Sequence, residues 1–555
     1  MRPHVQLRSH GRHAAFFVGW GSLRISRLGV GHPGPHYTRF MPATGNPFLL
    51  TRILATVGPA CADPATLAKM IEEGVRVFRV NCSHGDLPQF QATVDLIRQA
   101  SLDAGQPVGI LGDLSGPKIR VTTVRDGALE LAAGDTVHFT TRDVVADRDP
   151  ESAVVTVGTT YPEMVTDVKD GQRLLVNDGA IRMLVTGHAD DPSESEPGGR
   201  CLVATVTVGG TLSNKKGVNL PDTDVSAPAL TEWDEECAAW AVEAGCDFLA
   251  LSFVRKADDV HQLNALLKTL GRDNTDMRSH TALPIIAKIE KPQAIDELDG
   301  ILDAADGVMV ARGDLGVEME LASVPVMQKT IIRRAHAHGK PVIVATQMLE
   351  SMIENPFPTR AEVSDVANAI IDGADAVMCS GETAVGKHPL EVIRVMARTA
   401  NLTEAYDADQ RAGTTRPPSN LRETRYRTAA LAHGVSTIIN DLHPKCVVMW
   451  SELGGGARYL SQNRLRVPVV AVSGNHVALR RMSLHFGVHP VFMERPADGI
   501  AFVEEVDGLL VDNGWADPGD GVVIVKGDPL GIPGVTNQIR IHYVGDVCRL
   551  TWHPK

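Results

Sequence analysis

The sequence predicts an α/β fold: a (β/α)8 TIM barrel with an inserted β-rich lid domain, followed by a C-terminal α/β domain. Short apolar runs alternate with helical patterns through most of residues 49–405, which is typical of parallel strands buried on both faces. Several of these runs end in charged residues, as in barrels whose functional groups stand at the carboxyl ends of the strands. The alternation stops once, and short amphipathic strands take its place.

The barrel is expected to occupy residues 49–120 and 220–405. Its eight strands are expected at residues 51–57, 75–80, 108–112, 248–253, 284–287, 307–311, 341–346 and 376–380. The first helix is expected to begin after Asp63, because Asp is a favoured N-cap and the following Pro fits the first helical turn. Thr231 is the expected N-cap of the helix that resumes the alternation after the insertion.

Three further segments differ in composition from the barrel. Residues 121–219 alternate apolar and polar positions between Gly, Asp and Pro, which predicts a small β-barrel or sandwich carried on one βα loop. Residues 406–423 are polar and contain two consecutive prolines, so they are predicted to be a linker. Residues 424–555 show strand and helix patterns again and form the predicted C-terminal α/β regulatory or oligomerisation domain.

Residues 1–48 are predicted to be a disordered tail or the product of a misplaced start codon. The first forty residues hold six Arg and five His, and the first acidic residue of the chain is Asp63. An Arg-rich, acid-free composition is also typical of a transit peptide. The sequence leaves open whether translation starts at Met1 or at Met41.

The overall composition excludes several classes of protein. Hydrophobic residues make up 43% of the chain and charged residues 22%, which is ordinary for a globular protein. A net charge of −13 argues against a nucleic-acid binder. No apolar run is long enough to span a bilayer. The eight cysteines are scattered without metal-site spacing, which favours a reducing, cytoplasmic location.

Residues 283–316 carry the strongest local evidence for a catalytic site. One expected strand is followed by Lys288 and Glu290, and the next by Asp314. These side chains should converge, since parallel barrel strands deliver their carboxyl ends to one face. Two carboxylates suit a divalent metal, and an ammonium suits a phosphate. A pair of salt-bridged strand ends is the structural alternative.

Ten segments, in order over about 340 residues, resemble the pyruvate kinase family: TRILATVGPA, FRVNCSHG, DLSGPKIR, NKKGVNLP, LSFVRKADDV, IIAKIEKPQAI, GVMVARGDLGVE, KPVIVATQMLESM, PTRAEVSDVANAIIDGADAV and CSGETAVGKHPLEV. The resemblance implies a barrel with a lid and a C-terminal α/β domain, usually in a homotetramer. It also implies glycolytic transfer of a phosphoryl group from phosphoenolpyruvate to ADP, giving pyruvate and ATP. Mg²⁺ is the implied cofactor, and an enolate is protonated after the transfer.

The resemblance also assigns roles to individual residues. Glu290 and Asp314 match the metal ligands, and Lys288 matches the lysine that neutralises the migrating phosphoryl group. Thr346 matches a residue near the methylene carbon of the substrate, where a hydroxyl would position a water or a proton relay. The other matched substrate-binding positions are Arg79, which would bind phosphate, and Gly313, which would let the substrate carboxylate approach the backbone.

Further matches lie around this centre. The implied nucleotide-binding residues are Arg120, Lys216, Asn81 and His84. Asp178, inside the lid, is expected to face the site together with Lys216 when the lid closes over the nucleotide and excludes water. Ser364 and Glu382 match family positions with supporting roles.

The sequence departs from the family at its monovalent-cation site. Most pyruvate kinases bind K⁺ through residues that match Asn81, Ser83, Asp113 and Leu114. The family normally has a glutamate where this chain has Lys118, and Leu114 and Val121 replace polar residues of the K⁺-requiring type. A lysine ammonium has about the size and charge of the ion. The pattern resembles the K⁺-independent branch, in which Lys118 would supply the positive charge.

The C-terminal domain departs from the sugar-bisphosphate-regulated members. These carry a Ser/Thr-rich phosphate loop after the first strand of that domain, whereas residues 450–458 here hold one serine, Ser451, and an acidic residue, Glu452. The acidic side chain would repel a phosphate, so activation by fructose 1,6-bisphosphate is not expected. The sequence leaves the effector open.

Two alternatives of other classes remain at this point. A catalytically silent, metabolite-binding paralogue would be favoured by loss of Lys288, Glu290 or Asp314, and all three are present. A barrel lyase or aldolase acting on the pyruvate enolate would not need the lid, Arg120 or Lys216, which serve a nucleotide.

The Lys118 hypothesis predicts activity without potassium. We expect equal rates of pyruvate formation from phosphoenolpyruvate and ADP in K⁺ and in a bulky organic cation, with Mg²⁺ present and ionic strength equal. The measurement is a coupled pyruvate assay in the two salts. A rate that appears only in K⁺ would contradict the role given to Lys118.

Overall fold

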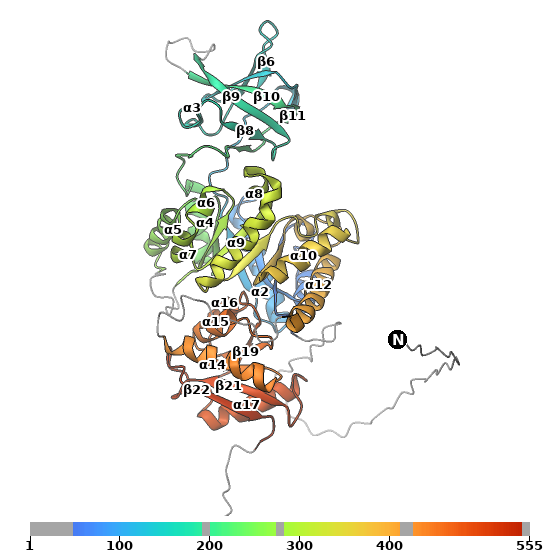
Figure 1. Ribbon diagram of the computed structural model, residues 1–555, viewed down its shortest axis with the longest axis vertical. Helices are drawn as coiled ribbons and strands as arrows, with labels where there is room; N and C mark the ends of the chain where they lie inside the picture. Colours follow the sequence, from blue (N-terminus) through green and yellow to red (C-terminus); the bar gives the residue numbers. More distant parts are fainter. Residues whose placement is uncertain (1–47, 191–199, 273–281, 411–425, 547–555) are drawn as a thin grey trace, which may run out of the picture. The chain divides into compact units, whose positions relative to one another are not determined.

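The computed structural model describes residues 48–190, 200–272, 282–410 and 426–546. Eight parallel strands close into a barrel in the order β1-β17-β16-β15-β14-β13-β3-β2 (Figure 1). They are β1 (Arg52–Thr56), β2 (Val75–Asn81), β3 (Gly109–Asp113), β13 (Phe248–Leu251), β14 (Ile285–Ile289), β15 (Gly307–Ala311), β16 (Val342–Ala345) and β17 (Ala376–Cys379). The predicted barrel is confirmed, and each strand lies within two residues of its expected bounds.

Helices pack around these strands and bury a continuous apolar layer between strand and helix (Figure 1). They are α1 (Pro64–Glu72), α2 (Leu87–Asp103), α4 (Glu232–Glu243), α5 (Ala257–Thr269), α6 (Gln293–Asp296), α7 (Leu298–Ala304), α8 (Arg312–Glu318), η2 (Leu321–Ser323), α9 (Val324–Ala337), η3 (Glu350–Ile353), α10 (Arg360–Asp372), α11 (Gly381–Ala384) and α12 (Pro389–Gln410). Both predicted N-caps are present: the Asp63 side chain accepts from Thr66 N, and Thr231 forms a capping box with Asp234. Among the described helices, none has both the length and the apolar character that a bilayer span requires.

The insertion forms a β-rich unit with its own buried core. Seven strands form one sheet in the order β12-β8-β9-β10-β5-β7-β6, and β11 pairs with β4. The elements are η1 (Arg125–Gly127), β4 (Ala128–Leu131), β5 (Thr136–Thr140), β6 (Asp147–Arg148), β7 (Val155–Gly158), α3 (Met164–Asp167), β8 (Arg173–Val176), β9 (Ile181–Asp190), β10 (Arg200–Val208), β11 (Gly210–Ser213) and β12 (Val218–Asn219). Residues 119–121 and 216–219, which we call the neck, join this lid to the barrel.

The C-terminal region is a five-stranded sheet with helices between its strands, in the order β20-β19-β18-β21-β22. Only β22 runs antiparallel to its neighbour. The elements are α14 (Arg427–Leu442), β18 (Val447–Trp450), α15 (Gly455–Gln462), β19 (Val469–Ser473), α16 (His476–Met482), β20 (Val488–Phe492), α17 (Gly499–Asp512), β21 (Gly521–Lys526) and β22 (Gln538–Tyr543).

Three details differ from the sequence prediction. The local sequence pattern does not predict strand β20, because His489 and Pro490 interrupt its apolar run. Helix α12 extends to Gln410 and so includes the start of the predicted linker; residues 411–425 lie outside the described residues. Phe48, assigned to the N-terminal extension, is 7% exposed and belongs to the core of the C-terminal sheet; residues 1–47 also lie outside the described residues.

A buried carboxylate ties the C-terminal region to the barrel. Asp247, which is 1% exposed, accepts from Arg480 Nε of α16 and from Arg98 Nη2 of α2, both at 2.8 Å. It also accepts from the Ile110 amide of β3 at 2.9 Å. Leu484, just after α16, packs into the apolar interior of the barrel. The amino ends of the barrel strands are therefore covered by side chains from the C-terminal region.

Buried His489 predicts a specific acid sensitivity of the fold. Its ring meets Phe48 and Trp515 edge-on, and burial, then repulsion by Arg76 and Arg52, lowers the pKa of His489 well below its usual value. The fold therefore holds His489 neutral, while the unfolded chain takes up a proton as the pH falls below about 6.5. Stability from this group is present above that pH and is lost as the pH falls towards the folded pKa.

We expect the wild-type free energy of unfolding to fall by up to about 1.4 kcal/mol more per pH unit than that of His489→Gln between about pH 6.5 and 5. Urea denaturation at a series of pH values measures this difference. The exposed His261→Gln is the matched control and should keep the wild-type slope. Parallel slopes for His489→Gln and wild type would contradict the assignment.

Candidate active site

The centre of the site is a lysine near the carboxyl end of β14 whose side chain is 12% exposed. Lys288 Nζ donates to Ser252 Oγ at 2.7 Å and to Glu290 Oε1 at 2.9 Å, and it lies 3.4 Å from Asp113 Oδ1. Burial by itself would lower the pKa of Lys288, but the two carboxylates raise it above its ordinary value. The ammonium is therefore a permanent, fixed cation.

Glu290 is one of the two carboxylates beside the Lys288 ammonium. Its side chain is 1% exposed, and Oε2 accepts from the Phe253 amide at 2.6 Å. Phe253 has a φ of 54°, a strained conformation for a bulky residue, and this turn of the backbone presents its N–H to the carboxylate. Burial raises the pKa of Glu290, and repulsion by Asp314 raises it further.

The pair Glu290 and Asp314 fits a magnesium ion. Repulsion by Asp314 contributes to the raised pKa of Glu290, and a divalent cation bound by both carboxylates would relieve this repulsion. No cluster of three or more Asp, Glu, His or Cys suited to a metal occurs among the described residues. Two carboxylates are nevertheless enough for Mg²⁺, which keeps several waters and is completed by substrate phosphates.

A second cation lies beside Lys288. Arg79 Nε, on β2, donates to Asp113 Oδ2 at 2.6 Å, and its Nη1 donates to Thr56 Oγ1 at 3.2 Å. Asp113 is 1% exposed. Burial by itself would raise the pKa of Asp113, but Lys288 and Arg79 together lower it. The ends of β1, β2, β3 and β14 thus form one charge-compensated cluster.

Thr346 occupies a strained turn after β16. Its φ is 71°, a conformation that costs a β-branched residue on the order of 1–3 kcal/mol. The hydroxyl accepts from the Gly313 amide and donates to the Ala345 carbonyl, each at 2.6 Å. Arg312 Nη2 donates to the Thr346 carbonyl at 2.8 Å and helps to hold the turn. The hydroxyl is thereby fixed against the first turn of α8.

Arg312 and Glu382 stabilise the backbone at and after this turn. Arg312 pairs with Asp365 at 2.6 Å and is 9% exposed. Glu382, 2% exposed, accepts from the amides of Leu349 and Ser380. Both side chains stabilise the backbone after the strands. Ser364, the other predicted supporting residue, is exposed on α10.

The predicted nucleotide residues lie on the neck and after β2. Arg120 Nη1 donates to the Lys215 carbonyl at 2.9 Å, and the Lys216 carbonyl accepts from Val121 N at 2.9 Å. Asn81 pairs with Asp113 across the strands and its side chain accepts from Ser83 N, while His84 is exposed. Asp178 lies in the turn between β8 and β9, in the lid and outside the barrel cluster.

The predicted monovalent-cation residues are only partly brought together. Asp113 and Leu114 are buried, whereas Ser83 and Lys118 are exposed. Asp113 receives the ammonium of Lys288 and the guanidinium of Arg79 instead of Lys118. The Leu114 carbonyl accepts from Ser252 Oγ at 2.7 Å. That Lys118 replaces potassium stays a prediction.

Sequence reasoning missed the partners that hold the cluster. Ser252 and Thr56 touch Lys288 and Arg79 directly, and Arg312 fixes Thr346. Ser252 follows β13, so its place at a strand end was the available signal. Its partner is 36 residues away in the sequence, and only the closed barrel reveals the contact.

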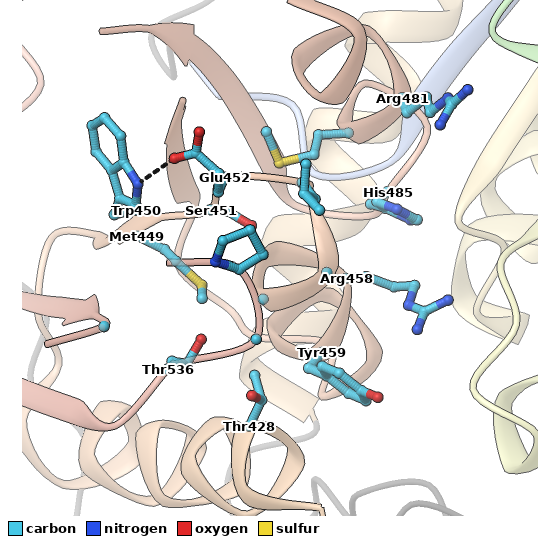
Figure 2. A pocket seen from close by; sticks show the side chains of 18 of the residues that line it. Thr428, Met449, Trp450, Ser451, Glu452, Arg458, Tyr459, Arg481, His485 and Thr536 are labelled. Atoms are coloured by element: carbon cyan, nitrogen blue, oxygen red, sulfur yellow. Dashed lines mark hydrogen bonds between the residues drawn. The ribbon is translucent and has the colours of Figure 1, made fainter. Parts of the chain in front are cut away.

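A cavity of about 520 Å³ lies in the C-terminal region (Figure 2). Loops 450–456 and 531–536 form much of its wall, and Phe248 and Ile286 of the barrel also line it. Glu452 accepts from Trp450 Nε1 at 3.0 Å. Figure 2 shows this pair on one side of the cavity and basic side chains, including Arg458, on the other. The cavity wall therefore contains both acidic and basic side chains.

Comparisons with known proteins agree with this geometry. Residues 49–393 match the family model for the pyruvate kinase barrel domain, and residues 429–542 match the model for the pyruvate kinase alpha/beta domain. The chain is 38% identical over 500 residues to a pyruvate kinase of Corynebacterium glutamicum, covering 90% of this chain and 98% of that protein. It is 40% identical to one of Sporosarcina psychrophila, covering 90% and 81%. It is 38% identical to one of Mycobacterium tuberculosis, covering 89% and 98%.

Proposed function

The chain belongs to the pyruvate kinase family, and we propose which of its side chains carry out the reaction. It is an enzyme that transfers the phosphoryl group of phosphoenolpyruvate to ADP and gives pyruvate and ATP, the activity of glycolytic pyruvate kinases. The observation that supports the residue roles is the compensated cluster around Lys288, with Glu290 and Asp314 beside it.

Lys288 and Arg79 are proposed to bind the phosphoryl group during transfer. Phosphoryl transfer is catalysed mainly by positioning and by stabilisation of charge on the phosphoryl oxygens. A lysine whose pKa is raised stays charged, and its contacts with Ser252 and Asp113 fix its place. A preorganised cation needs no rearrangement as charge develops, which is why such groups contribute strongly to rates.

Glu290 and Asp314 are proposed to hold magnesium. When bound there, the ion supplies positive charge to the oxygens of the phosphoryl group and of the enolate. The chain itself would contribute the buried Glu290, the half-buried Asp314 and the Gly313 amide at the start of α8. That amide is bonded to Thr346 Oγ1, so a substrate carboxylate that takes the amide would release the threonine hydroxyl.

Thr346 is proposed to position the proton that converts the enolate to pyruvate. A hydroxyl has too high a pKa to act alone as the acid, so it orients a water or a relay towards the methylene carbon. Asn81, His84, Arg120 and Lys216 are proposed to bind the nucleotide. Closure of the lid over them would exclude water that could otherwise accept the phosphoryl group.

Three substitutions test these roles in a pyruvate assay with phosphoenolpyruvate, ADP and Mg²⁺. Lys288→Met should lower kcat by about 10³-fold, since it removes a fixed cation from the phosphoryl group. Thr346→Val should lower kcat by about 10²-fold through slower proton delivery. Glu290→Gln should raise the Mg²⁺ concentration needed for half-maximal rate.

Lys329→Met is the matched control, because Lys329 pairs with Asp372 on the outer helices α9 and α10. It should keep the wild-type kcat. Full activity in Lys288→Met would exclude Lys288 from the transfer, and an unchanged magnesium requirement in Glu290→Gln would exclude that residue as a ligand.

We also propose that the chain acts as a cytoplasmic homotetramer. Leu321, Val326 and Phe357 are 71%, 57% and 78% exposed on the η2–α10 side of the barrel. On the C-terminal sheet, Ile541 and Tyr543 are 50% and 51% exposed along the edge strand β22. Exposed apolar groups and an uncovered sheet edge favour association. Two such surfaces on one chain suit a tetramer.

The cavity of Figure 2 is proposed to be an effector site that does not accept fructose 1,6-bisphosphate. Glu452 stands in its wall, and its negative charge opposes a phosphate group. We expect fructose 1,6-bisphosphate to leave the half-saturating phosphoenolpyruvate concentration unchanged within twofold, measured from initial rates. Activation of several fold at micromolar sugar bisphosphate would contradict this proposal.

A further inference from the structure

Glu318 is a buried carboxylate that has none of the roles proposed above. It is the last residue of α8 and is 2% exposed. Helix α8 is short and begins directly after β15, and it carries both Gly313 and Asp314 in its first turn. A buried carboxylate needs donors, because losing water costs it several kcal/mol. The identity of those donors therefore shows what Glu318 connects.

Two side chains from other parts of the chain donate to Glu318. Lys291 Nζ lies 2.9 Å from Glu318 Oε1, and Asn219 Nδ2 donates to the same oxygen at 2.9 Å. Lys291 directly follows Glu290, and Asn219 ends β12 in the neck. We call Glu318, Lys291 and Asn219 the Glu318 junction. It joins the neck to both segments that carry the proposed magnesium ligands.

The neck end of the junction is itself rigidly held. Val218 N donates to the Ile119 carbonyl and Val121 N donates to the Lys216 carbonyl, each at 2.9 Å. Arg120 forms a bridge with Gly217 between these bonds. A movement of the neck therefore moves Asn219 together with Arg120 and Lys216, which are the proposed nucleotide residues.

The lid meets α8 at a second, neighbouring point. Gly179, in the turn between β8 and β9, is close enough that an added Cβ would lie 3.7 Å from the Val317 side chain. The Asn177 amide of that turn donates to the Gly217 carbonyl of the neck at 3.0 Å. Residues 317 and 318 of α8 thus face the lid turn and the neck, respectively.

The other carboxylate oxygen of Glu318, Oε2, takes no part in the contacts with Lys291 and Asn219. Glu318 Oε2 is buried and has no hydrogen-bond partner among the described residues. Glu318 borders a cavity of about 40 Å³ that Asp314 and Lys118 line together with apolar side chains such as Val218. The junction therefore opens towards the metal-binding carboxylate and is not sealed inside the apolar core.

We propose that Glu318 is a positioning residue that couples the neck of the lid to α8. Through it, the placement of Arg120 and Lys216 on the nucleotide and the placement of Gly313 and Asp314 on the substrate change together. The inference rests on the proposed function, because it assigns the nucleotide to the neck and the metal to α8. Glu318 touches neither reactant, so its effect on the reaction passes through Asp314 and through Asn219.

A double-mutant cycle on ADP kinetics tests the coupling. Glu318→Gln removes the charged acceptor of the hydrogen bond from Asn219, and Asn219→Ala removes its donor on the neck. We expect each single variant to lower kcat/KM for ADP about tenfold, as expected for a lost hydrogen bond to a charged group. The double variant should also lose about tenfold, not a hundredfold, since both changes break the same link. KM for phosphoenolpyruvate should change less than KM for ADP.

Glu73→Gln is the matched control. Glu73 accepts from Arg394 Nε at 2.8 Å between α1 and α12, remote from the neck, and its loss should leave both KM values unchanged. Thermal melting of every variant separates folding from coupling. If Glu318→Gln does not fold, Asn219→Ala, at the partly exposed Asn219, decides the question alone.

Multiplying losses in the double variant would overturn the proposal, because the two residues would then act independently. Losses that are equal for ADP and phosphoenolpyruvate would also overturn it, since they would indicate a general distortion of α8. Wild-type ADP kinetics in Asn219→Ala would exclude the neck contact. Pyruvate formation by the wild-type protein tests the proposed function separately from all these outcomes.

Discussion

The site depends on one buried arrangement of charge, the ammonium of Lys288 between Asp113 and Glu290. With Arg79 added, two cations and two anions balance within a few ångströms. Each group alone would carry a large desolvation cost, so the cluster is stable only when it is complete. Closure of the barrel makes it complete, because β2, β3 and β14 deliver Arg79, Asp113 and Lys288 to one face. The closed barrel is therefore what brings together the charges around Lys288.

Most of the barrel could be predicted from the sequence because a parallel strand buried on both faces is a continuous apolar run. The local pattern does not predict two other segments, strand β20 of the C-terminal sheet and the end of helix α12. Strand β20 contains His489 and Pro490, yet the histidine is neutral and packs against Phe48 and Trp515. The end of α12 reads as a linker, since residues 406–410 are almost entirely polar. For β20, tertiary contacts that the local pattern does not contain decide the outcome.

The same limit applies to the site. Its charged residues lie at strand ends, so the sequence identified them, but it could not show how their charges are shared. The positive φ of Thr346 and of Phe253 is likewise invisible in the sequence. Both turns aim a polar group at the site: a hydroxyl at the Gly313 amide and an amide at Glu290. Arg312 and the barrel strands hold these strained turns, which is where such strain is expected in an enzyme.

One strand links this site to the C-terminal cavity. Ile286, near the start of β14, lines that cavity and lies in the barrel interior with Leu484, which lines it too. Two residues further along the same strand, Lys288 pairs with Glu290 in the charge cluster. Packed interiors transmit displacement because they contain few voids. A displacement of Leu484 would therefore act on Ile286 and so on β14, the strand that carries Lys288.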